Sequence, residues 1–541
     1  MPKTLRCAFL CIALVLAGYL RVSGLTWGLS GGYGHYRNFQ PDEFVSLRGV
    51  LEIDLLRGQF KAPDAYFEGT FNYYLWALPQ AALKLSSKTE SPSPASTSGA
   101  DHSDLLYIGR WMSVLFDLCT VVIVFLAIRE ATRNVYPSLL GAFVYAVLPM
   151  QVIYAHFMRT HLLSNLLCGL VIWLSLKFRR GPKWWMLFVV GFISGLAGAT
   201  RFPNGIILVV PCLYFLFDRS DHLPSGKTRL RERAKHFLTG PIWLIGFGFA
   251  FGLFAGYPML FLDLPSVINA VKGGVLPYAS LKEFKGSNVL NFWVVWRYGS
   301  FLIPCAMYPF LWLLPYFAIL YLCFRRSLYH QSLPILIFSG LYLYFMAKGY
   351  LGPYFARATI LLFPGFSILV GLAFSDLWLL LGKHRAAVFF LITGPLLLAL
   401  PSIGFDMAYV KAMQQMDARS ALREDLEKLI GNSPATVGVS RFGGYFYTVM
   451  PAVDPLKSEK VAVQLQESDQ KADFFLAGFE GPIDSGHLDA VVKRIEAEGN
   501  FRYEKSYSVR PKIFGRELRL ARFPSDMTYP FPTILLFRPK V

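Results

Sequence analysis

Residues 113–129 read "SVLFDLCTVVIVFLAIR", an almost unbroken apolar run that ends at a basic residue. Runs of roughly 20 apolar residues recur from the N-terminus to about residue 404, and each is long enough to cross a bilayer. The composition agrees, because the 541-residue chain is 54% hydrophobic and 16% charged, with a mean hydropathy of +0.42. Soluble domains usually carry about a quarter charged residues. The sequence therefore predicts a polytopic membrane protein, mainly α-helical in its apolar part.

The formal net charge of +18 comes from basic residues that lie in short loops between the apolar runs. Cytoplasmic loops of membrane proteins carry such residues, so the charge indicates membrane topology and not a nucleic-acid partner. Five basic segments mark cytoplasmic loops: Arg129 with Arg133, Lys177 to Lys183, residues 219–236, Arg325 with Arg326, and Lys383 to Arg385.

One span or one pair of spans between successive basic segments gives about eleven spans. We expect them near residues 7–23, 104–128, 136–155, 162–176, 184–200, 204–217, 238–258, 292–322, 333–347, 358–380 and 386–404. The first run is preceded by Lys3 and Arg6 and is followed by Arg21, without a clean cleavage site. It is therefore interpreted as an uncleaved span with a cytoplasmic N-terminus, and an odd number of spans then puts the C-terminus outside.

Three substantial pieces are expected on the outer face: the loops 24–103 and 259–291, and a domain from 405 to 541 that follows the transmembrane domain 1–404. In that last piece, residues 416–430 and 488–499 have helical periodicity. Strand patterns occupy 435–440, 472–479, 501–509 and 533–539. The pattern predicts a small α/β domain without a catalytic constellation, which covers the outer opening or binds a partner.

Cysteines and glycines in the apolar runs predict packing and no cofactor. All seven cysteines fall in or beside apolar runs, so neither a disulfide framework nor a zinc site is expected. Gly248, Gly252 and Gly256 recur every four residues within one run, which favours close helix packing over a nucleotide-binding loop.

Two adjacent carboxylates, Asp42 and Glu43, follow the first span in "NFQPDEF" (38–44). A structural explanation is available, because Pro41 suits the first position of a helix and acids in the first turn complement the helix dipole. The following residues are amphipathic and suit a helix on the membrane surface. Ionisable groups near a bilayer are costly, however, so a functional role is the competing explanation.

Five stretches in order resemble one enzyme family. They are "QPDEF" (40–44), "FEGTFNYYLWAL" (67–78), "YAHFMRTHLLSNLL" (154–167), "GLAGATRFPNGIILVVP" (195–211) and "YLGPYFARATILLFPGFSILVG" (350–371). Together they resemble the GT-C membrane glycosyltransferases, in the branch of the protein O-mannosyltransferases and aminoarabinose transferases. The resemblance covers roughly residues 7–404, and the C-terminal domain is similar to outer domains of some bacterial members.

The resemblance implies an inverting transfer of a sugar from a polyprenyl-phosphate carrier to a hydroxyl of a lipid, glycan or protein. It also implies an extracytoplasmic site in a bacterial inner membrane. The acid of the first loop acts as the general base in this family, which assigns that role to Asp42 and a supporting or acceptor-orienting role to Glu43. A carboxylate base and positive charge on the departing phosphate are what such chemistry requires.

Basic residues near the outer ends of the spans are the candidates for holding the phosphate. Arg357 and Arg201 are guanidinium groups suited to oxyanions, and Lys348 is a further candidate. Snorkelling to the interface is the structural alternative for both arginines. His156, Arg159 and His161 are expected to converge on the outer mouth, where His161 stands in place of an Asp that family members often carry. That replacement weakens the case for a bound divalent metal, and no cofactor is predicted.

Tyr73 and Tyr74 suit stacking on the sugar or acceptor, or an aromatic belt at the interface. Two other functions stay open at this point. A multi-pass transporter or lipid flippase predicts internal repeats and ionisable residues within the spans, for which Asp117 is the one candidate. A family member that has lost catalysis and kept a scaffold role is the other.

Overall fold

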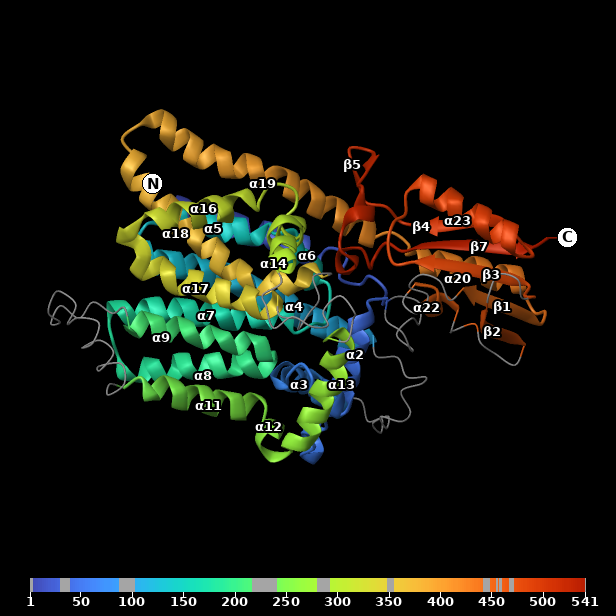
Figure 1. Cartoon of the computed structure of the whole chain (residues 1–541), viewed down its shortest axis with the longest axis horizontal. Coiled ribbons are helices and arrows are strands. Elements are labelled where there is room, and N and C mark those ends of the chain that lie inside the picture. The colour runs from blue at the N-terminus through green and yellow to red at the C-terminus, as the bar shows by residue number, and fades with distance from the viewer. Residues whose placement is uncertain are drawn as a thin grey trace.

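The computed structural model describes residues 3–29, 39–86, 103–216, 241–279, 292–347, 355–440, 448–453, 456, 460–466 and 471–540. Figure 1 shows a bundle of helices in roughly the same direction, with the domain that contains the sheet at one end. The long helices of the bundle are α1 (Lys3–Val22), α4 (Ser103–Thr132), α7 (His161–Arg180), α8 (Trp184–Thr200), α11 (Trp243–Gly256), α16 (Leu313–Phe324), α17 (Tyr329–Phe345), α18 (Phe363–Leu381) and α19 (Arg385–Met413).

Shorter helices complete the bundle and its end nearest the sheet. In the bundle these are α5 (Val135–Ala146), α6 (Pro149–Ala155), α9 (Val209–Leu216), α14 (Phe292–Arg297) and α15 (Ile303–Ala306). At the end of the bundle lie α2 (Pro41–Leu51), η2 (Leu55–Arg57), η3 (Pro63–Ala65), α3 (Phe71–Ser86), α12 (Met259–Leu262) and α13 (Leu264–Ala279). Segments of 3-10 helix are η5 (Phe202–Leu208), η8 (Arg326–Leu328) and η10 (Ala356–Leu362).

Four helical segments among the described residues are long and apolar enough to cross a membrane: Ser103–Thr132, His161–Arg180, Ala356–Leu381 and Arg385–Ile430. The bent pair α5 and α6 makes a fifth if it is one span. Several other expected spans form shorter apolar helices, so the count of eleven stays a prediction. The expectation of an integral membrane protein is supported by these helices.

Two expected spans differ from the structure in their course. The stretch expected as one span at 292–322 is divided into α14, a π-helical turn η7 (Tyr298–Leu302), α15 and α16. Pro304 and Pro309 lie in this stretch, and each lacks the N–H that a continuous helix needs. The last bundle helix, α19, continues to Met413, which is beyond the expected end at 404.

The close-packing role predicted for the glycines of α11 is confirmed. A Cβ atom on Gly248 would lie 2.2 Å from the carbonyl oxygen of Phe188, and one on Gly252 would lie 2.0 Å from that of Phe192. Because both carbonyls belong to α8, the two helix backbones touch directly. The predicted break between two short helices is also confirmed, since α8 ends at Thr200 and the 3-10 turn η5 leads into α9.

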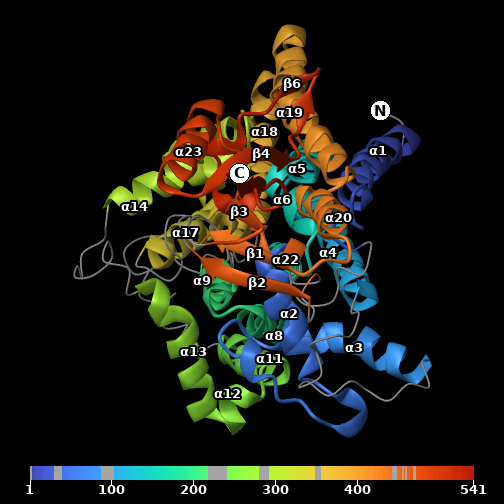
Figure 2. The ribbon, with the colours of Figure 1, turned by 90° about the vertical axis from the view of Figure 1, so that its right-hand side faces the viewer.

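The C-terminal α/β domain has a five-stranded sheet in the order β2-β1-β3-β7-β4. Its strands are β1 (Ala435–Ser440), β2 (Val461–Gln466), β3 (Phe474–Phe479), β4 (Phe501–Ser508) and β7 (Thr533–Pro539). β1 pairs in parallel with β2 and β3, whereas β7 is antiparallel to β3 and β4. The four expected strands and the helices α20 (Ala418–Ile430) and α23 (Ser485–Glu498) are confirmed, and α22 (Met450–Val453) and β2 are additions. Figure 2 views the molecule from the side of this domain.

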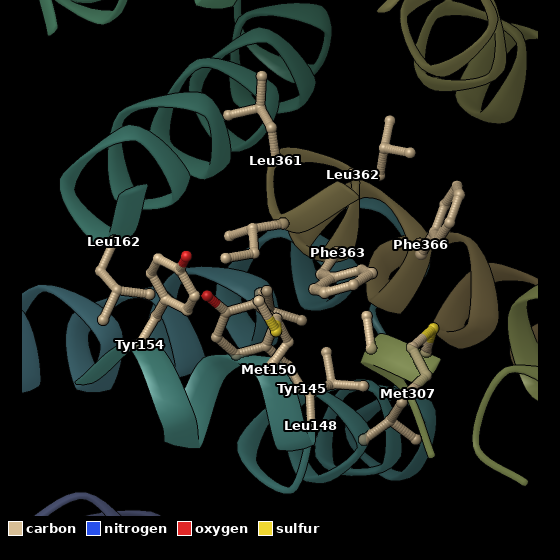
Figure 3. Close-up of a cluster of buried hydrophobic side chains, with 14 of the residues drawn as sticks. Tyr145, Leu148, Met150, Tyr154, Leu162, Met307, Leu361, Leu362, Phe363 and Phe366 are labelled. Atoms are coloured by element: carbon tan, nitrogen blue, oxygen red, sulfur yellow. The ribbon is translucent and has the colours of Figure 1, made fainter. Parts of the chain in front are cut away.

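The largest hydrophobic cluster holds η10 in place inside the bundle. Side chains of α6, α7 and α18, including Tyr154, Leu162 and Phe363, lie in one cluster with Leu361 of η10 (Figure 3). All seven residues of η10 are buried, Arg357 among them. A charged residue is therefore fixed within a packed core, which requires a compensating charge nearby.

Candidate active site

The helix that carries Asp42 and Glu43 begins where the sequence predicts. Gln40 is extended (φ −100°, ψ 117°) and its side-chain oxygen accepts a hydrogen bond from the backbone N–H of Glu43 at 2.7 Å. Pro41 then occupies the first turn. Consecutive residues of a helix are rotated by about 100°, so the two carboxylates leave the helix in different directions.

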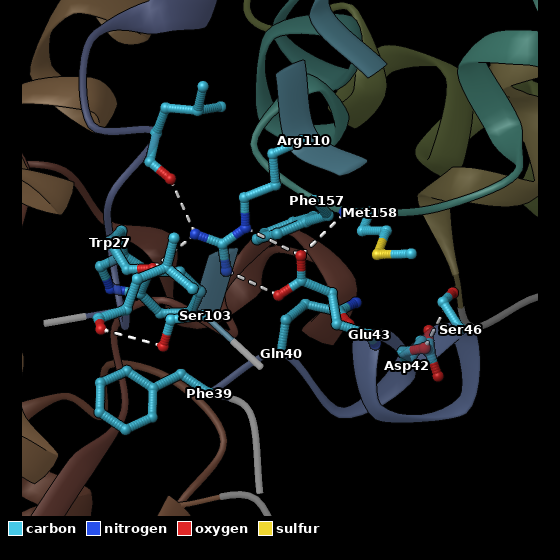
Figure 4. Close-up of polar contacts among 12 residues, drawn as sticks. Trp27, Phe39, Gln40, Asp42, Glu43, Ser46, Ser103, Arg110, Phe157 and Met158 are labelled. Atoms are coloured by element: carbon cyan, nitrogen blue, oxygen red, sulfur yellow. Dashed lines mark hydrogen bonds and ion pairs between the residues drawn. The ribbon is translucent and has the colours of Figure 1, made fainter. Parts of the chain in front are cut away.

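Glu43 is fully buried and belongs to the scaffold. Arg110 of α4 donates to both of its oxygens, from Nε at 2.9 Å and from Nη2 at 2.7 Å (Figure 4). The backbone N–H of Met158 also donates to Glu43, at 2.8 Å. Arg110 further donates from Nη1 to the carbonyl oxygens of Leu25 and Trp27. This placement favours the supporting role for Glu43 over the acceptor-orienting one, because its carboxylate oxygens already accept hydrogen bonds from Arg110 of α4 and from the backbone N–H of Met158, between α6 and α7.

Asp42 lies beside Arg357, with Nη1 of Arg357 2.5 Å from Oδ2 of Asp42. About a quarter of the Asp42 side chain remains exposed, at 24%. Burial of Asp42 favours its neutral form, but the positive charges of Arg357 and Arg159 outweigh burial and lower the pKa of Asp42. Arg201 adds to that effect. Asp42 is therefore an ionised carboxylate at neutral pH, able to accept a proton.

Arg357 is held at its backbone and on one face of its guanidinium. The backbone N–H groups of Ala356 and Arg357 donate to the carboxylate of Asp526, at 3.1 and 2.7 Å. The guanidinium lies over the ring of Phe355, 4.1 Å from its centre. Asp42 is its hydrogen-bond partner among the described residues, and a guanidinium has five N–H donors. The other N–H groups are left to bind an oxyanion.

Asp526 comes from η13 (Ser525–Met527) in the C-terminal region, in which the sequence indicated no catalytic constellation. It is fully buried, and burial raises its pKa to about 6 although Arg357 acts in the opposite direction. This acid therefore joins the C-terminal region to the turn that carries Arg357. No pattern in the sequence distinguishes this buried acid from the exposed acids of the C-terminal region.

Arg159 fixes the start of α2 rather than facing an open site. It donates to the backbone oxygen of Asp42 at 2.8 Å and to Oγ of Ser46 at 3.0 Å. Its Nη2 donates to Glu68 at 2.6 Å, and the hydroxyl of Tyr73 donates to the other oxygen of Glu68 at 3.0 Å. Tyr73 is fully buried and packs edge-on against Trp76, so its ring does not present a face to a sugar.

Arg201 and His161 also keep polar atoms without a partner among the described residues, as does Nε of Arg159. Arg201 ends α8 in an extended conformation (φ −154°, ψ 127°), and its guanidinium pairs with no acid among the described residues. His161 is buried at the start of α7 against the ring of Tyr154, with ring centres 4.7 Å apart. Neither ring nitrogen of His161 has a hydrogen-bond partner in the described part of the chain.

The remaining candidates lie elsewhere. Both ring nitrogens of His156 contact carbonyl oxygens, those of Val152 at 2.7 Å and Ser23 at 2.8 Å, so this residue does not converge with the others on phosphate. Tyr74 donates to the carbonyl oxygen of Phe60. Lys348 lies outside the described residues. The structure thus brings together Asp42, Arg357 and Arg159, with Arg201 close enough to act on Asp42 through its charge.

Sequence reasoning missed three residues that position this group: Glu68, Arg110 and Asp526. Glu68 lies in the quoted stretch 67–78, where it is the one acid. Arg110 is a basic residue within an expected span, and rare intramembrane charges of that kind usually mark a partner. These two signals were present in the sequence, whereas Asp526 gave none.

The comparisons with known proteins agree with the motifs. Residues 105–255 match the family described as dolichyl-phosphate-mannose-protein mannosyltransferase, a segment that contains Arg159, His161 and Arg201. No curated protein sequence matches the chain.

Three solved structures are similar at low identity. The oligosaccharyltransferase of Archaeoglobus fulgidus, tethered with an acceptor peptide, is 13% identical, with a TM-score of 0.49 over 93% of this chain and 69% of that one. ArnT from Cupriavidus metallidurans, bound to undecaprenyl phosphate, is 13% identical, with a TM-score of 0.45 over 99% of this chain and 98% of that one. The Pmt1-Pmt2 protein O-mannosyltransferase complex of S. cerevisiae, bound to its sugar donor, is 15% identical, with a TM-score of 0.35 over 49% and 35%.

TM-scores below 0.5 carry no argument by themselves, so the evidence for relationship is the match of residues 105–255. That segment runs from the start of α4 to the end of α11 and includes four of the residues proposed from the motifs: His156, Arg159, His161 and Arg201. Over residues 105–255 the chain is therefore similar to a family of membrane glycosyltransferases, in agreement with the resemblance that its motifs indicated.

Proposed function

We propose that this protein transfers a sugar from a polyprenyl-phosphate donor to a hydroxyl acceptor, with inversion at the anomeric carbon and with Asp42 as the general base. The observation that carries the proposal is the contact between Asp42 and Arg357. It joins a carboxylate that accepts a proton to a guanidinium with further N–H groups for an oxyanion. Inverting transfer requires both groups near one anomeric carbon.

The proposed reaction balances in one step. The acceptor oxygen forms a bond to the anomeric carbon while the bond from that carbon to the phosphate oxygen breaks. Asp42 takes the proton of the hydroxyl, and the polyprenyl phosphate leaves with the electron pair. Arg357 stabilises the negative charge that develops on the phosphate, and Arg201, whose charge also acts on Asp42, adds to that effect.

The Asp42–Arg357 contact also couples donor binding to base strength. Arg357 lowers the pKa of Asp42, which keeps the carboxylate ionised but makes it a weak base. A phosphate bound to the same guanidinium neutralises part of its charge. The pKa of Asp42 then rises, so Asp42 becomes a stronger base when the donor is in place.

Asp42→Asn tests the proposal because it keeps the shape of the side chain and removes the proton acceptor. With purified full-length protein and a polyprenyl-phosphate sugar as donor, turnover is expected to fall by roughly 10²-fold or more. Donor affinity should change little, because Arg357 and Arg201 remain.

Asp64→Asn is the matched control. Like Asp42, Asp64 pairs with an arginine: its Oδ2 lies 2.5 Å from Nη2 of Arg48, a residue of α2. This pair is more exposed, with 35% of the Asp64 side chain and 52% of the Arg48 side chain accessible. The control is expected to retain normal turnover. Near-normal turnover of Asp42→Asn would refute the assignment of the base, and equal losses in both variants would indicate a general effect on α2.

A further inference from the structure

A two-stranded hairpin of the C-terminal region stands apart from the five-stranded sheet and lies against α19. Its strands are β5 (Lys512–Ile513) and β6 (Arg516–Glu517), with the pairs Lys512–Glu517 and Ile513–Arg516. Figures 1 and 2 both show the hairpin beside the C-terminal end of α19, projecting away from the sheet. A Cβ atom on Gly404 of α19 would lie 3.9 Å from Cδ1 of Ile513, so the two elements are in contact.

The contact lies where α19 is expected to leave the hydrocarbon layer. From Arg385 to Gly404, α19 rises about 29 Å at about 1.5 Å per residue. A bilayer has a hydrocarbon core of about 30 Å. The outward face of α19 over this length is apolar, with Leu396, Leu397 and Leu400 exposed at 42%, 64% and 60%. The hairpin is therefore at the level of the lipid head groups.

The hairpin is strongly basic at that level. Residues 510–519 contain Arg510, Lys512, Arg516 and Arg519 against the single acid Glu517, a net charge of +3. Lys512 is more than half exposed, and Arg516 and Arg519 are exposed as well. Glu517 forms ion pairs with Arg510 and Lys512, each at 3.8 Å, and one acid among four basic residues leaves the segment with its net charge of +3.

A pocket of ≈ 560 Å³ separates the hairpin from the end of α19. Lys411 and Gln415 line it on the helix side, and Arg510, Lys512, Phe514 and the acid Glu517 line it on the hairpin side. The pocket is thus bordered by three basic groups on one side of the apolar face of α19. Its volume and charge suit an anionic head group whose acyl chains run along that apolar face.

The tip of the hairpin places an aromatic ring in solvent at a conformational cost. Phe514 is fully exposed, and it has a positive φ of 48°, followed by Gly515 at 79°. Two-residue hairpins with positive φ at both positions favour Asn, Asp or Gly there, and a bulky side chain with positive φ is disfavoured. A phenylalanine that is both exposed and strained contributes nothing to folding, so it indicates a contact outside the chain.

We propose that the hairpin 510–519 and the end of α19 form a binding site for anionic phospholipid, which seats the C-terminal domain on the membrane surface. Phe514 enters the interfacial layer, while Lys411, Arg510 and Lys512 bind the phosphate of a head group. Aromatic rings prefer this interface, and basic residues near an anionic membrane surface bind it electrostatically. A membrane fits better than a protein partner, because the surface continues the lipid-facing side of α19 and lies at its exit from the bilayer.

Photo-cross-linking from the hairpin tip tests the proposal. The full-length protein carries p-benzoylphenylalanine in place of Phe514 and is placed in nanodiscs of phosphatidylcholine with a minor share of phosphatidylglycerol. Irradiation is expected to give lipid adducts, with phosphatidylglycerol enriched several-fold over its share of the lipid. Each basic residue near an anionic surface contributes roughly five-fold, so Lys512→Glu with Arg516→Glu should abolish the enrichment, and high salt should reduce it.

Two controls separate this result from general exposure to lipid. The same cross-linker at Leu465, a 40% exposed residue of β2, should give no lipid adduct. The double substitution Lys493→Glu with Arg502→Glu, on α23 and β4, changes the net charge by the same amount and should leave the enrichment intact. Absence of lipid adducts at 514, adducts in proportion to the lipid mixture, or adducts to a second protein chain would each overturn the proposal.

Discussion

Two neighbouring carboxylates of α2 each meet an arginine, with opposite consequences. Glu43 is enclosed and bound at both oxygens by Arg110, whereas Asp42 keeps 24% of its side chain exposed and contacts Arg357 through one nitrogen. Buried pairs with every polar atom satisfied fix one arrangement of the chain. A partly exposed pair whose guanidinium has unused N–H groups can exchange hydrogen-bond partners with a substrate. Glu43 therefore supports the fold, whereas Asp42 is available for the reaction, although both lie in one helical turn.

Glu43→Gln is expected to have the largest effect, and the effect is on folding. The substitution leaves Arg110 buried without its counter-charge, and breaking such a pair costs about 3–5 kcal/mol. Thermal unfolding of the detergent-solubilised protein should show a strongly lowered Tm, while the fraction that remains folded keeps its turnover. A protein of normal Tm with lost turnover would instead place Glu43 in the reaction and remove the contrast with Asp42.

Arg357→Gln tests the same comparison by replacing the arginine that contacts Asp42. Loss of a charged hydrogen bond to phosphate should lower kcat/KM by roughly ten-fold or more. Because Arg357 lowers the pKa of Asp42 and burial raises it, the substitution should also raise that pKa. The base acts only when ionised, so the acidic limb of the profile of kcat/KM against pH should move to higher pH.

Arg48→Gln is the control for that shift of the acidic limb, because Arg48 also pairs with an acid, the more exposed Asp64. Its profile is expected to match the unsubstituted protein. An acidic limb that does not move in Arg357→Gln would mean that Asp42 does not limit the reaction at low pH.

Asp526→Asn should have the smallest effect, visible in the pH dependence of stability. The folded-state pKa of Asp526 is raised to about 6, so the native protein holds this proton more tightly than the unfolded chain. Its contribution to stability is present in full below the unfolded pKa and is lost as the pH rises through about 6. The Tm of the unsubstituted protein should therefore fall between pH 5 and pH 7, and by less in Asp526→Asn. Equal slopes for the two proteins would contradict the burial of an ionisable group at this position.

Much of the architecture could be predicted because its signals are local. The apolar runs indicated most of the bundle helices, and Gln40 with Pro41 indicated the start of α2. The glycines of α11 predicted its contact with α8, and strand patterns predicted four strands of the sheet. Each of these signals depends on the residue types within a few positions or turns, which the sequence states directly. The division of the stretch 292–322 was missed because its prolines were counted as part of an apolar span.

The sequence by itself determined the membrane character, the helix that begins at Pro41, and the presence there of two acids with the motifs of a glycosyltransferase. Only the tertiary structure decided between the two acids. Asp42 and Arg357 are 315 positions apart, Arg357 and Asp526 are 169 apart, and Glu43 and Arg110 are 67 apart. Such partners meet only after the whole chain has packed, and the charge, burial and proton affinity of each carboxylate follow from the partner it meets.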